Sequence, residues 1–160
     1  MINYFPKFSF LLLPILIFIF SCKDDPVAGN NNDESPTDSV EAEVHRLVNE
    51  HRTGMGLPAL EWSETIAIEC RLHSQDMANA HTINHYGFNE RINKIGETIP
   101  WNWAGENVAY HYSAEGAVIA WLNSPGHQSN IESNSNLTGV GVAYDGETIY
   151  FTQIFIRSSN

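Results

Sequence analysis

The stretch W-L-N-S-P-G-H-Q-S-N-I (residues 121–131) organises this chain. An apolar helix end meets a break at Ser124-Pro125-Gly126. Proline cannot continue a helix and glycine frees the backbone, so the chain has to turn here. The turn places His127 at a rigid corner in a loop. Asn84-His85 and Gly105-Glu106-Asn107 are two further candidate corners, and we expect the three segments to converge on one cleft.

Apolar periodicity on both sides of this stretch predicts an α+β fold. Helices are expected at about 38–54, 64–80, 89–96 and 113–122, capped by Asp38, Ser63, Asn89 and Ser113. Strands are expected at 139–144 and 148–156, joined through the hairpin signal Asp145-Gly146, and the second half of 101–112 is a candidate edge strand. This order favours helices that cover an antiparallel sheet.

Residues 1–21 have the features of a signal peptide. Lys7 precedes an apolar run from Phe8 to Phe20, which is shorter than the roughly 20 residues of a membrane-spanning helix. The run ends in Ile19-Phe20-Ser21-Cys22, which resembles a bacterial lipobox, so we expect Cys22 to be lipidated after cleavage. The alternatives are an ordinary signal peptide with an incidental cysteine and an uncleaved anchor.

The residues after Cys22 indicate where the protein is sent. Lys23-Asp24-Asp25 resembles the signal that exports some lipoproteins to the outer face of the outer membrane, and the alternative is the start of an ordinary acidic linker. Residues 22–37 are acidic and rich in Asn and Pro, which predicts a flexible tether. The folded domain is then 38–160, extracytoplasmic and lipid-anchored in a bacterial membrane.

Composition excludes several classes of function. The chain has 19 acidic and 8 basic residues and a formal net charge of −11, a balance that repels nucleic acid.

Without Cys22, only Cys70 remains, so no disulfide can form within the domain. We expect Cys70 to be a small buried side chain and not a reactive nucleophile, and the domain to be monomeric.

Two of the seven histidines are candidate ligands for a metal. His85 and His127 lie in expected loops beside glycine or proline, and paired imidazoles in a cleft bind zinc or another divalent cation. Their separation of 42 residues is no recognised ligand spacing. Glu106 is expected to orient an imidazole, to act as a base on a bound water, or to accept backbone amides. The remaining histidines are expected to be solvated (His45, His81, His111) or packed with one hydrogen bond (His51, His73).

A set of short motifs, each weak alone, occurs in a recognisable order. They are H-S-Q-D-M-A (73–78), I-N-H (83–85), R-I-N-K-I-G (91–96), A-G-E-N-V-A (104–109), W-L-N-S-P-G-H-Q-S-N-I (121–131), G-V-G-V-A (139–143) and F-T-Q-I-F (151–155). Together they resemble the bacterial branch of the CAP superfamily over roughly residues 40–156. That superfamily includes cysteine-rich secretory proteins, insect venom antigens and plant pathogenesis-related proteins.

The resemblance implies a three-layer α-β-α sandwich with a central antiparallel sheet, helices on both faces and a cleft. In the family this cleft usually holds two histidines and two acidic residues, and several members bind zinc or another divalent ion there. The matching positions are His85, Glu106 and His127, while Ser124 stands where the second acid is usual. Further cleft residues implied by the motifs are Ser124, Asn107, Asn130 and Gln153. The missing acid argues against mechanisms that need paired carboxylates and weakens the expected metal affinity.

The sequence is compatible with three functions. The first is a membrane-tethered binding module for a lipid, peptide or glycan, with or without a metal, and the absence of a clear nucleophile favours it. The second is a metal-assisted, peptidase-like hydrolase with Glu106 as the base and a water on a metal held by His85 and His127. The third is a hydrolase in which Ser124 or Ser129 is the nucleophile and His127 assists it. This function is disfavoured because no strained elbow motif surrounds these serines.

Overall fold

The structure, a computed structural model, describes residues 36–159 of the chain and the side chains from Val40 onward. Asp33–Asn160 forms one compact unit. The expected signal peptide of residues 1–21, the lipidation site at Cys22 and nearly all of the expected tether lie outside the described residues. Among the helices of residues 36–159, none is long and apolar enough to cross a bilayer.

Five helices and four strands follow one another along the described chain. In order they are α1 (Pro36–Gly54), β1 (Glu61–Trp62), α2 (Glu64–Ala80), α3 (Phe88–Gly96), β2 (Trp101–Tyr110), α4 (Ala114–Leu122), α5 (Pro125–Ile131), β3 (Leu137–Asp145) and β4 (Thr148–Ser158). The four strands form one sheet in the order β1-β3-β4-β2. β2 is therefore an edge strand, as the sequence predicted.

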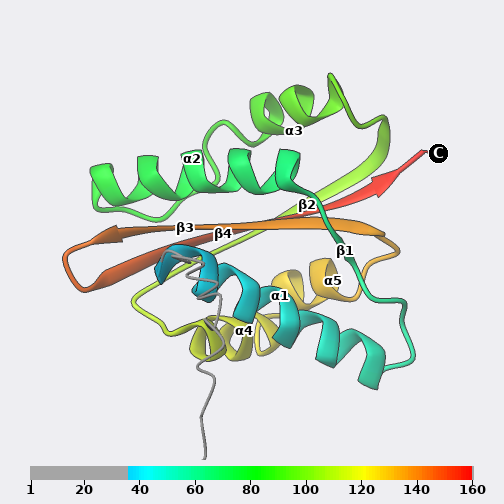
Figure 1. The fold of residues 1–160 in the computed structure, drawn as a ribbon, viewed down its shortest axis with the longest axis horizontal. Coiled ribbons are helices and arrows are strands. Elements are labelled where there is room, and N and C mark those ends of the chain that lie inside the picture. Colours follow the sequence, from blue (N-terminus) through cyan, green and yellow to red (C-terminus); the bar gives the residue numbers. More distant parts are fainter. Residues whose placement is uncertain (1–35, 160) are drawn as a thin grey trace, which may run out of the picture. The chain divides into compact units, whose positions relative to one another are not determined.

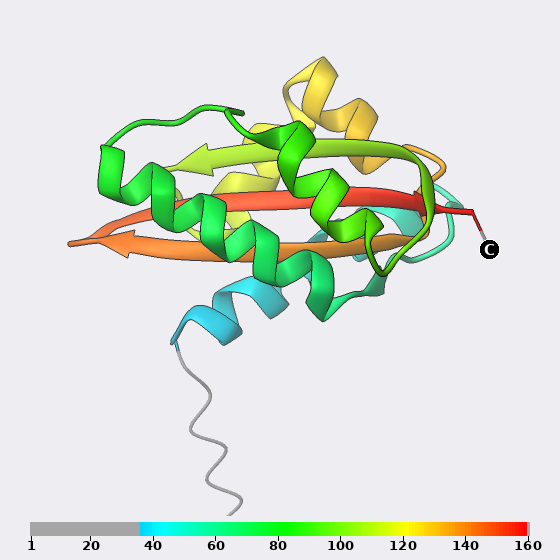
Figure 2. The ribbon, with the colours of Figure 1, turned by 90° about the horizontal axis from the view of Figure 1, so that it is seen from above.

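Helices cover both faces of this sheet (Figures 1 and 2). α2 and α3 lie on one face, with α2 over β3 and β4 and α3 beside β2, whereas α1, α4 and α5 lie on the other. The expected α-β-α sandwich is thus confirmed. The three long strands β2, β3 and β4 are antiparallel. The sheet is nevertheless mixed, because β1 pairs with β3 in parallel. The sequence did not predict β1, which is only two residues long.

The pleat of the central strand divides the core into two parts. Ile154 and Ile156 of β4 pack with Ile66, Cys70 and Ile95 of α2 and α3. Phe151 and Phe155 pack on the opposite face, in a cluster that includes Val44, Val48 and Trp121. Cys70 is fully buried, as expected, and loss of solvent is the main reason that the pKa of its thiol is raised well above the usual value. The expectation of an inert cysteine is therefore supported.

Two glycines of β3 allow α2 to approach the sheet closely. A Cβ atom on Gly139 would lie 2.3 Å from the backbone nitrogen of Ala67, and one on Gly141 would lie 2.0 Å from that of Arg71. Such separations are far below van der Waals contact. The G-V-G-V pattern thus places the glycines under α2 and the valines on the opposite face.

Several element boundaries differ from those expected. Gly87, at φ 74°, and not Asn89, occupies the N-cap position of α3. β2 spans the whole of Trp101–Tyr110, and the hairpin loop is Gly146-Glu147, one residue later than expected. His127 lies in the short helix α5 and not in a loop. Pro125 explains this difference, because proline ends one helix and is also favoured in the first turn of the next.

Candidate functional site

A buried carboxylate on the edge strand anchors the candidate site. Glu106 of β2 is 6% exposed. Arg91 of α3 donates to its Oε2 from Nε at 3.0 Å and from Nη2 at 2.6 Å, and His85 Nδ1 donates to its Oε1 at 2.8 Å. Arg91 Nη1 also donates to the carbonyl of Tyr86 at 2.6 Å. The loop that carries His85 is therefore tied to the sheet through one carboxylate with a compensated charge.

The next residue of β2 fixes the opposite layer. Because adjacent residues of a strand point to opposite faces, Glu106 faces α3 and Asn107 faces α5. Asn107 Nδ2 donates to the carbonyl of His127 at 3.1 Å. Asn130 Nδ2 donates to Asn107 Oδ1 at 2.9 Å and to the carbonyl of Glu106 at 3.1 Å. Two consecutive residues thus position both of the histidine-bearing segments.

The segments that carry His85 and His127 are held to β2 by Glu106 and Asn107, which point to opposite faces of the strand. The pKa of His127 is lowered, first by burial and second by the nearby charge of His85. The two rings, which belong to segments on different layers, therefore interact electrostatically. His127 is half-buried, and its lowered pKa favours the neutral ring, which is the form that metals bind. His85 uses Nδ1 on Glu106, which leaves its Nε2 for a ligand.

An apolar pocket opens beside His127. Its volume is about 260 Å³, and it is lined by Ile83, Val108, Ala109, Tyr110, Tyr112, Ala120, Trp121, Ser124 and His127. Trp121 is 1% exposed and its indole nitrogen donates to the carbonyl of Val108 at 3.0 Å, which fixes that wall of the pocket. Ser124 occupies the N-cap position of α5, where its side chain makes no capping hydrogen bond. The pocket therefore joins aromatic and aliphatic walls to one imidazole.

The donor set suits a weakly held metal at most. Within residues 36–159, no three His, Cys, Asp or Glu side chains are grouped so that they could hold an ion. The available donors are His85 Nε2 and the ring of His127, since both oxygens of Glu106 already accept hydrogen bonds. Two imidazoles leave the remaining coordination positions to water.

Gln153 differs from the other predicted cleft residues. It lies on the central strand β4, fully buried, and its Nε2 donates to Thr138 Oγ1 at 3.2 Å. Its backbone pairs with Asn107 of β2, but its amide belongs to the sheet interior. In contrast, Ser124 lines the pocket, and Asn107 and Asn130 join β2 to α5.

Sequence reasoning missed Arg91. A signal was present, because Arg91 stands four residues before the buried Ile95 and so shares the inner face of α3. The other histidines follow expectation except one. His81 and His111 are exposed, and His73 is buried with one hydrogen bond to the carbonyl of Asn84, but His45 is half-buried and bonds to the carbonyl of Leu60. His51 is half-buried and bonds to Glu132.

The sequence matches the model of the cysteine-rich secretory protein family, CAP, over residues 45–155. The chain belongs to the CAP family. The uncharacterized protein YkwD of Bacillus subtilis (strain 168) is 36% identical over 128 residues, which cover 76% of this chain and 49% of that protein. The membrane protein YlbC of the same organism is also 36% identical, over 73% of this chain and 34% of its own length. This chain thus spans half or less of these relatives.

Solved structures share the CAP fold. An extracellular protein with an SCP domain from Bacillus anthracis is 30% identical, with a TM-score of 0.67 over 76% of this chain and 41% of that protein. An outer surface protein of Borrelia burgdorferi has a TM-score of 0.69 at 21% identity, over 76% of this chain and 94% of its own. The bacterial CAP domain therefore accounts for the three-layer arrangement of helices and sheet.

Proposed function

We propose that this chain is an extracytoplasmic CAP-domain protein, tethered to a bacterial membrane through a lipid on Cys22, whose cleft binds a ligand. The observation that carries the proposal is the contrast between Glu106 and its surroundings. Both oxygens of Glu106 are engaged by Arg91 and His85, whereas the pocket beside His127 is open and apolar. Such a site is built to hold a molecule.

The shape of the pocket indicates the part of the ligand that it receives. A volume of about 260 Å³ between Tyr110, Tyr112 and Trp121 accommodates one apolar group, such as an acyl segment or a large peptide side chain. His127 and Ser124 then lie where a polar neighbour of that group can accept or donate a hydrogen bond. A lipid or an apolar peptide fits this pattern better than a bare glycan.

A divalent ion such as zinc has a place in the same proposal. His85 Nε2 and the His127 ring would hold it, and its chemistry would be that of a Lewis acid that polarises a ligand oxygen. The lowered pKa of His127 supports this role, because a neutral ring is needed. Ser124 supplies no charge, so we expect weak affinity.

The hydrolase alternative needs a free base. Glu106 would have to release His85 or Arg91 before it could accept a proton from water, and its side chain is 2% exposed. Ser124 and Ser129 make no hydrogen bond to His127 within the described residues, so the serine alternative also lacks a base. Binding therefore accounts for the geometry with fewer rearrangements.

The relatives and the N-terminal sequence support a location outside the cytoplasm. The Bacillus anthracis protein is described as extracellular and the Borrelia burgdorferi protein as an outer surface protein. Together with the lipobox at Cys22, these support anchoring outside the cytoplasm, with the outer membrane and its exposed face as the proposed destination. Digestion of intact cells with a protease tests exposure, and fatty-acid labelling of Cys22→Ser tests the anchor.

Two titrations on the whole chain in detergent test the cleft. Calorimetric titration with zinc should show binding that His127→Ala abolishes and that His81→Asn, an exposed control at φ 50°, retains. Fluorescence of anilinonaphthalene sulfonate should report the pocket and fall in Ala120→Phe, which fills it, but not in Ile119→Phe, which is exposed on the same helix. Metal-dependent cleavage of peptides or esters that His127→Ala removes would instead establish the hydrolase.

A further inference from the structure

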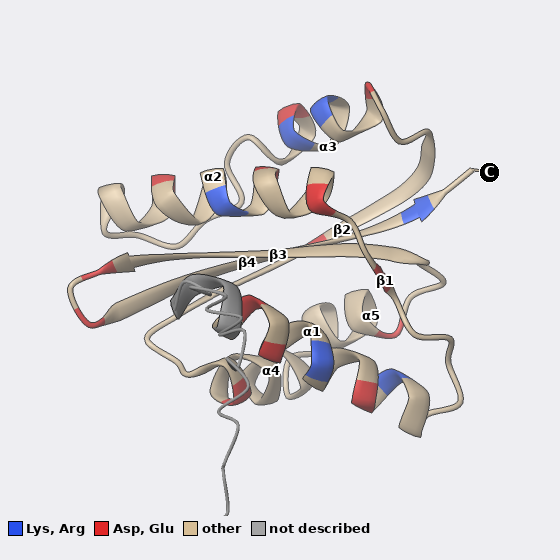
Figure 3. Ribbon diagram, viewed as in Figure 1, with Lys and Arg blue, Asp and Glu red and all other residues tan. Residues whose placement is uncertain are grey.

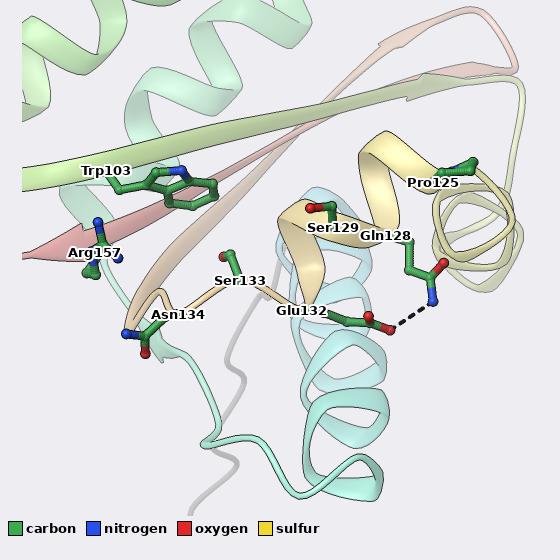
Figure 4. A pocket seen from close by; sticks show the side chains of 8 residues that line it. All are labelled: Trp103, Pro125, Gln128, Ser129, Glu132, Ser133, Asn134 and Arg157. Atoms are coloured by element: carbon green, nitrogen blue, oxygen red, sulfur yellow. Dashed lines mark hydrogen bonds between the residues drawn. The ribbon is translucent and has the colours of Figure 1, made fainter.

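A second groove lies beside α5. It has a volume of about 510 Å³ and is lined by Trp103 of β2, Arg157 of β4, Pro125, Gln128 and Ser129 of α5, and Glu132, Ser133 and Asn134 of the following loop. Figure 4 shows these side chains on the strands, on α5 and on the loop that follows it. The groove shares no lining residue with the apolar pocket beside His127. Its chemistry is also different, because polar side chains dominate.

The aromatic wall of this groove is held in place. A Cβ on Gly105 would lie 2.8 Å from the ring carbon Cη2 of Trp103 and 2.7 Å from Asn130 Oδ1. Glycine at this position therefore lets the indole ring lie across the strand against α5. Trp103 also packs against the core while it stays half-buried. One side of the ring is thus fixed and the rest is presented to the groove.

Trp103 is unlike the other tryptophans. Trp62, Trp101 and Trp121 each donate the indole N–H to an acceptor, namely Glu64, Ile92 and Val108. The indole N–H of Trp103 has no acceptor within residues 36–159. A half-buried aromatic ring with a free donor offers a flat apolar surface and one hydrogen bond.

Arg157 is unlike the other arginines. Arg46, Arg71 and Arg91 pair with carboxylates, and Arg52 donates to backbone carbonyls. Arg157 is opposite Trp103 in the β2–β4 register. In Figure 3, the blue colour of basic residues appears on β4 near the C-terminal end of the strand. Its Nε donates to Asn102 Oδ1, and its terminal N–H groups have no partner in the described part of the chain. This is an uncompensated cation in a chain with a net charge of −11.

The remaining wall supplies neutral hydrogen-bonding groups. Gln128 Nε2 donates to Glu132 Oε1 at 2.9 Å, so the amide oxygen of Gln128 remains available. Within residues 36–159, the Ser129 hydroxyl and the Asn134 amide also make no hydrogen bonds. These groups both donate and accept, as sugar hydroxyls do. Glu132, which His51 also contacts at 2.9 Å, can accept from a hydroxyl but would repel a second anion close to it.

We infer that this groove binds an acidic oligosaccharide. The apolar face of one sugar ring lies on the Trp103 indole, its carboxylate pairs with the terminal N–H groups of Arg157, and the hydroxyls of the next sugar bond to Gln128, Ser129 and Asn134. A guanidinium and a carboxylate form charge-assisted hydrogen bonds that are stronger than neutral ones. The single cation thus selects an acidic sugar over a neutral one.

Calorimetry on the whole chain in detergent tests this assignment. The probe is a hexasaccharide that alternates glucuronic acid and N-acetylglucosamine, and the neutral comparison is a hexamer of N-acetylglucosamine. The acidic probe should bind more tightly than the neutral one. Arg157→Gln should weaken binding of the acidic probe by about tenfold or more, which corresponds to the loss of one charge-assisted contact. The same variant should no longer bind the acidic probe more tightly than the neutral one. Trp103→Leu should weaken the binding of both probes.

Arg46→Gln is the matched control, because Arg46 is an exposed arginine on α1 and should leave binding unchanged. Circular dichroism of each variant separates a lost site from a lost fold. The inference is overturned if neither sugar binds the wild-type chain, if Arg157→Gln and Arg46→Gln bind alike, or if a short peptide with a free carboxylate displaces the acidic probe at lower concentration than the sugar itself.

Discussion

Arg91 donates two hydrogen bonds to a single oxygen of Glu106, at 3.0 and 2.6 Å, and leaves the other oxygen to His85. Arg91 and Glu106 are both buried, on α3 and β2. Arg91 therefore compensates the buried charge of Glu106, and Glu106 in turn holds the loop that carries His85. Stability and ligand binding should consequently fail together when the Arg91–Glu106 pair is broken.

Arg91→Met leaves the Glu106 carboxylate buried without its main partner. Because breaking a buried ion pair strands a charge, we expect the free energy of unfolding to fall by about 3–5 kcal/mol. Urea denaturation measures this loss. Arg46→Met is the comparison, since it breaks the exposed pairs with Glu43 and Glu50 and should change the denaturation midpoint little. Equal effects from the two variants would show that burial of the Arg91–Glu106 pair is unimportant.

The candidate site around His85, Glu106 and His127 was predicted only in part from the sequence. Periodicity located the long helices, and the ordered motifs indicated the family and so His85, Glu106 and His127. Helix α5 was missed because only Ile131 of its seven residues is buried, which leaves no apolar periodicity to detect. That the histidines arrive from opposite faces of β2 depends on the alternation at Glu106 and Asn107, and thus on a register that no local pattern determines.

The groove beside α5 was also beyond prediction. Trp103 and Arg157 are 54 positions apart and become neighbours only through the β2–β4 pairing, next to a register shift between Trp101 and Trp103. The close packing of α2 on β3 could not be predicted from the sequence either. Gly139 and Gly141 are visible in the sequence, and so is the helix at 64–80, but the packing of that helix over these glycines is not.

Gly141→Ala tests that close packing. The added Cβ would lie 2.0 Å from the backbone of α2, which cannot move as a flexible side chain would. We expect a loss of about 3 kcal/mol in the free energy of unfolding, at the upper end of typical overpacking costs. Gly54→Ala is the control, because a Cβ there meets nothing within 4 Å and alanine favours a helix. A stable Gly141→Ala protein would mean that α2 shifts readily on the sheet.

Two buried amides in register allow a matched comparison. Asn107 uses both its donor and its acceptor. Asn107→Leu removes the donor to the carbonyl of His127 and one of the two acceptors of the Asn130 amide, so we expect a loss of about 2–4 kcal/mol in the free energy of unfolding. Gln153 Oε1 accepts no hydrogen bond within the described residues. Thr138 Oγ1 donates to the carbonyl of Ile154, so an amide flip would not supply the missing donor. Gln153→Met should therefore remain within about 1 kcal/mol of wild type in thermal unfolding.

A large loss in Gln153→Met would contradict this account, because it would show that Oε1 has a partner whose removal is costly. A small loss in Asn107→Leu would contradict the role of Asn107 in holding α5. The zinc titration of Asn107→Leu adds a second readout. Displacement of the His127 backbone should weaken binding even where the protein stays folded.

The free energy of unfolding should depend on pH through His127 and His73. Burial lowers the pKa of His127 below its usual value of 6.5, with His85 as the second cause, and burial also lowers the pKa of His73. Between each lowered pKa and 6.5 the unfolded chain binds more protons than the folded one, so the free energy of unfolding falls as pH falls below about 6.5. His127→Gln and His73→Gln should each flatten the decline seen in urea denaturation between about pH 7 and pH 5, and the double variant should flatten it most. Glu132, whose pKa is lowered from 4.5 chiefly by its hydrogen bond to Gln128, acts below this window. An unchanged slope in His127→Gln would mean that its ring is as easily protonated in the folded protein as in the unfolded chain, and that the cleft does not hold a neutral imidazole ready for a ligand.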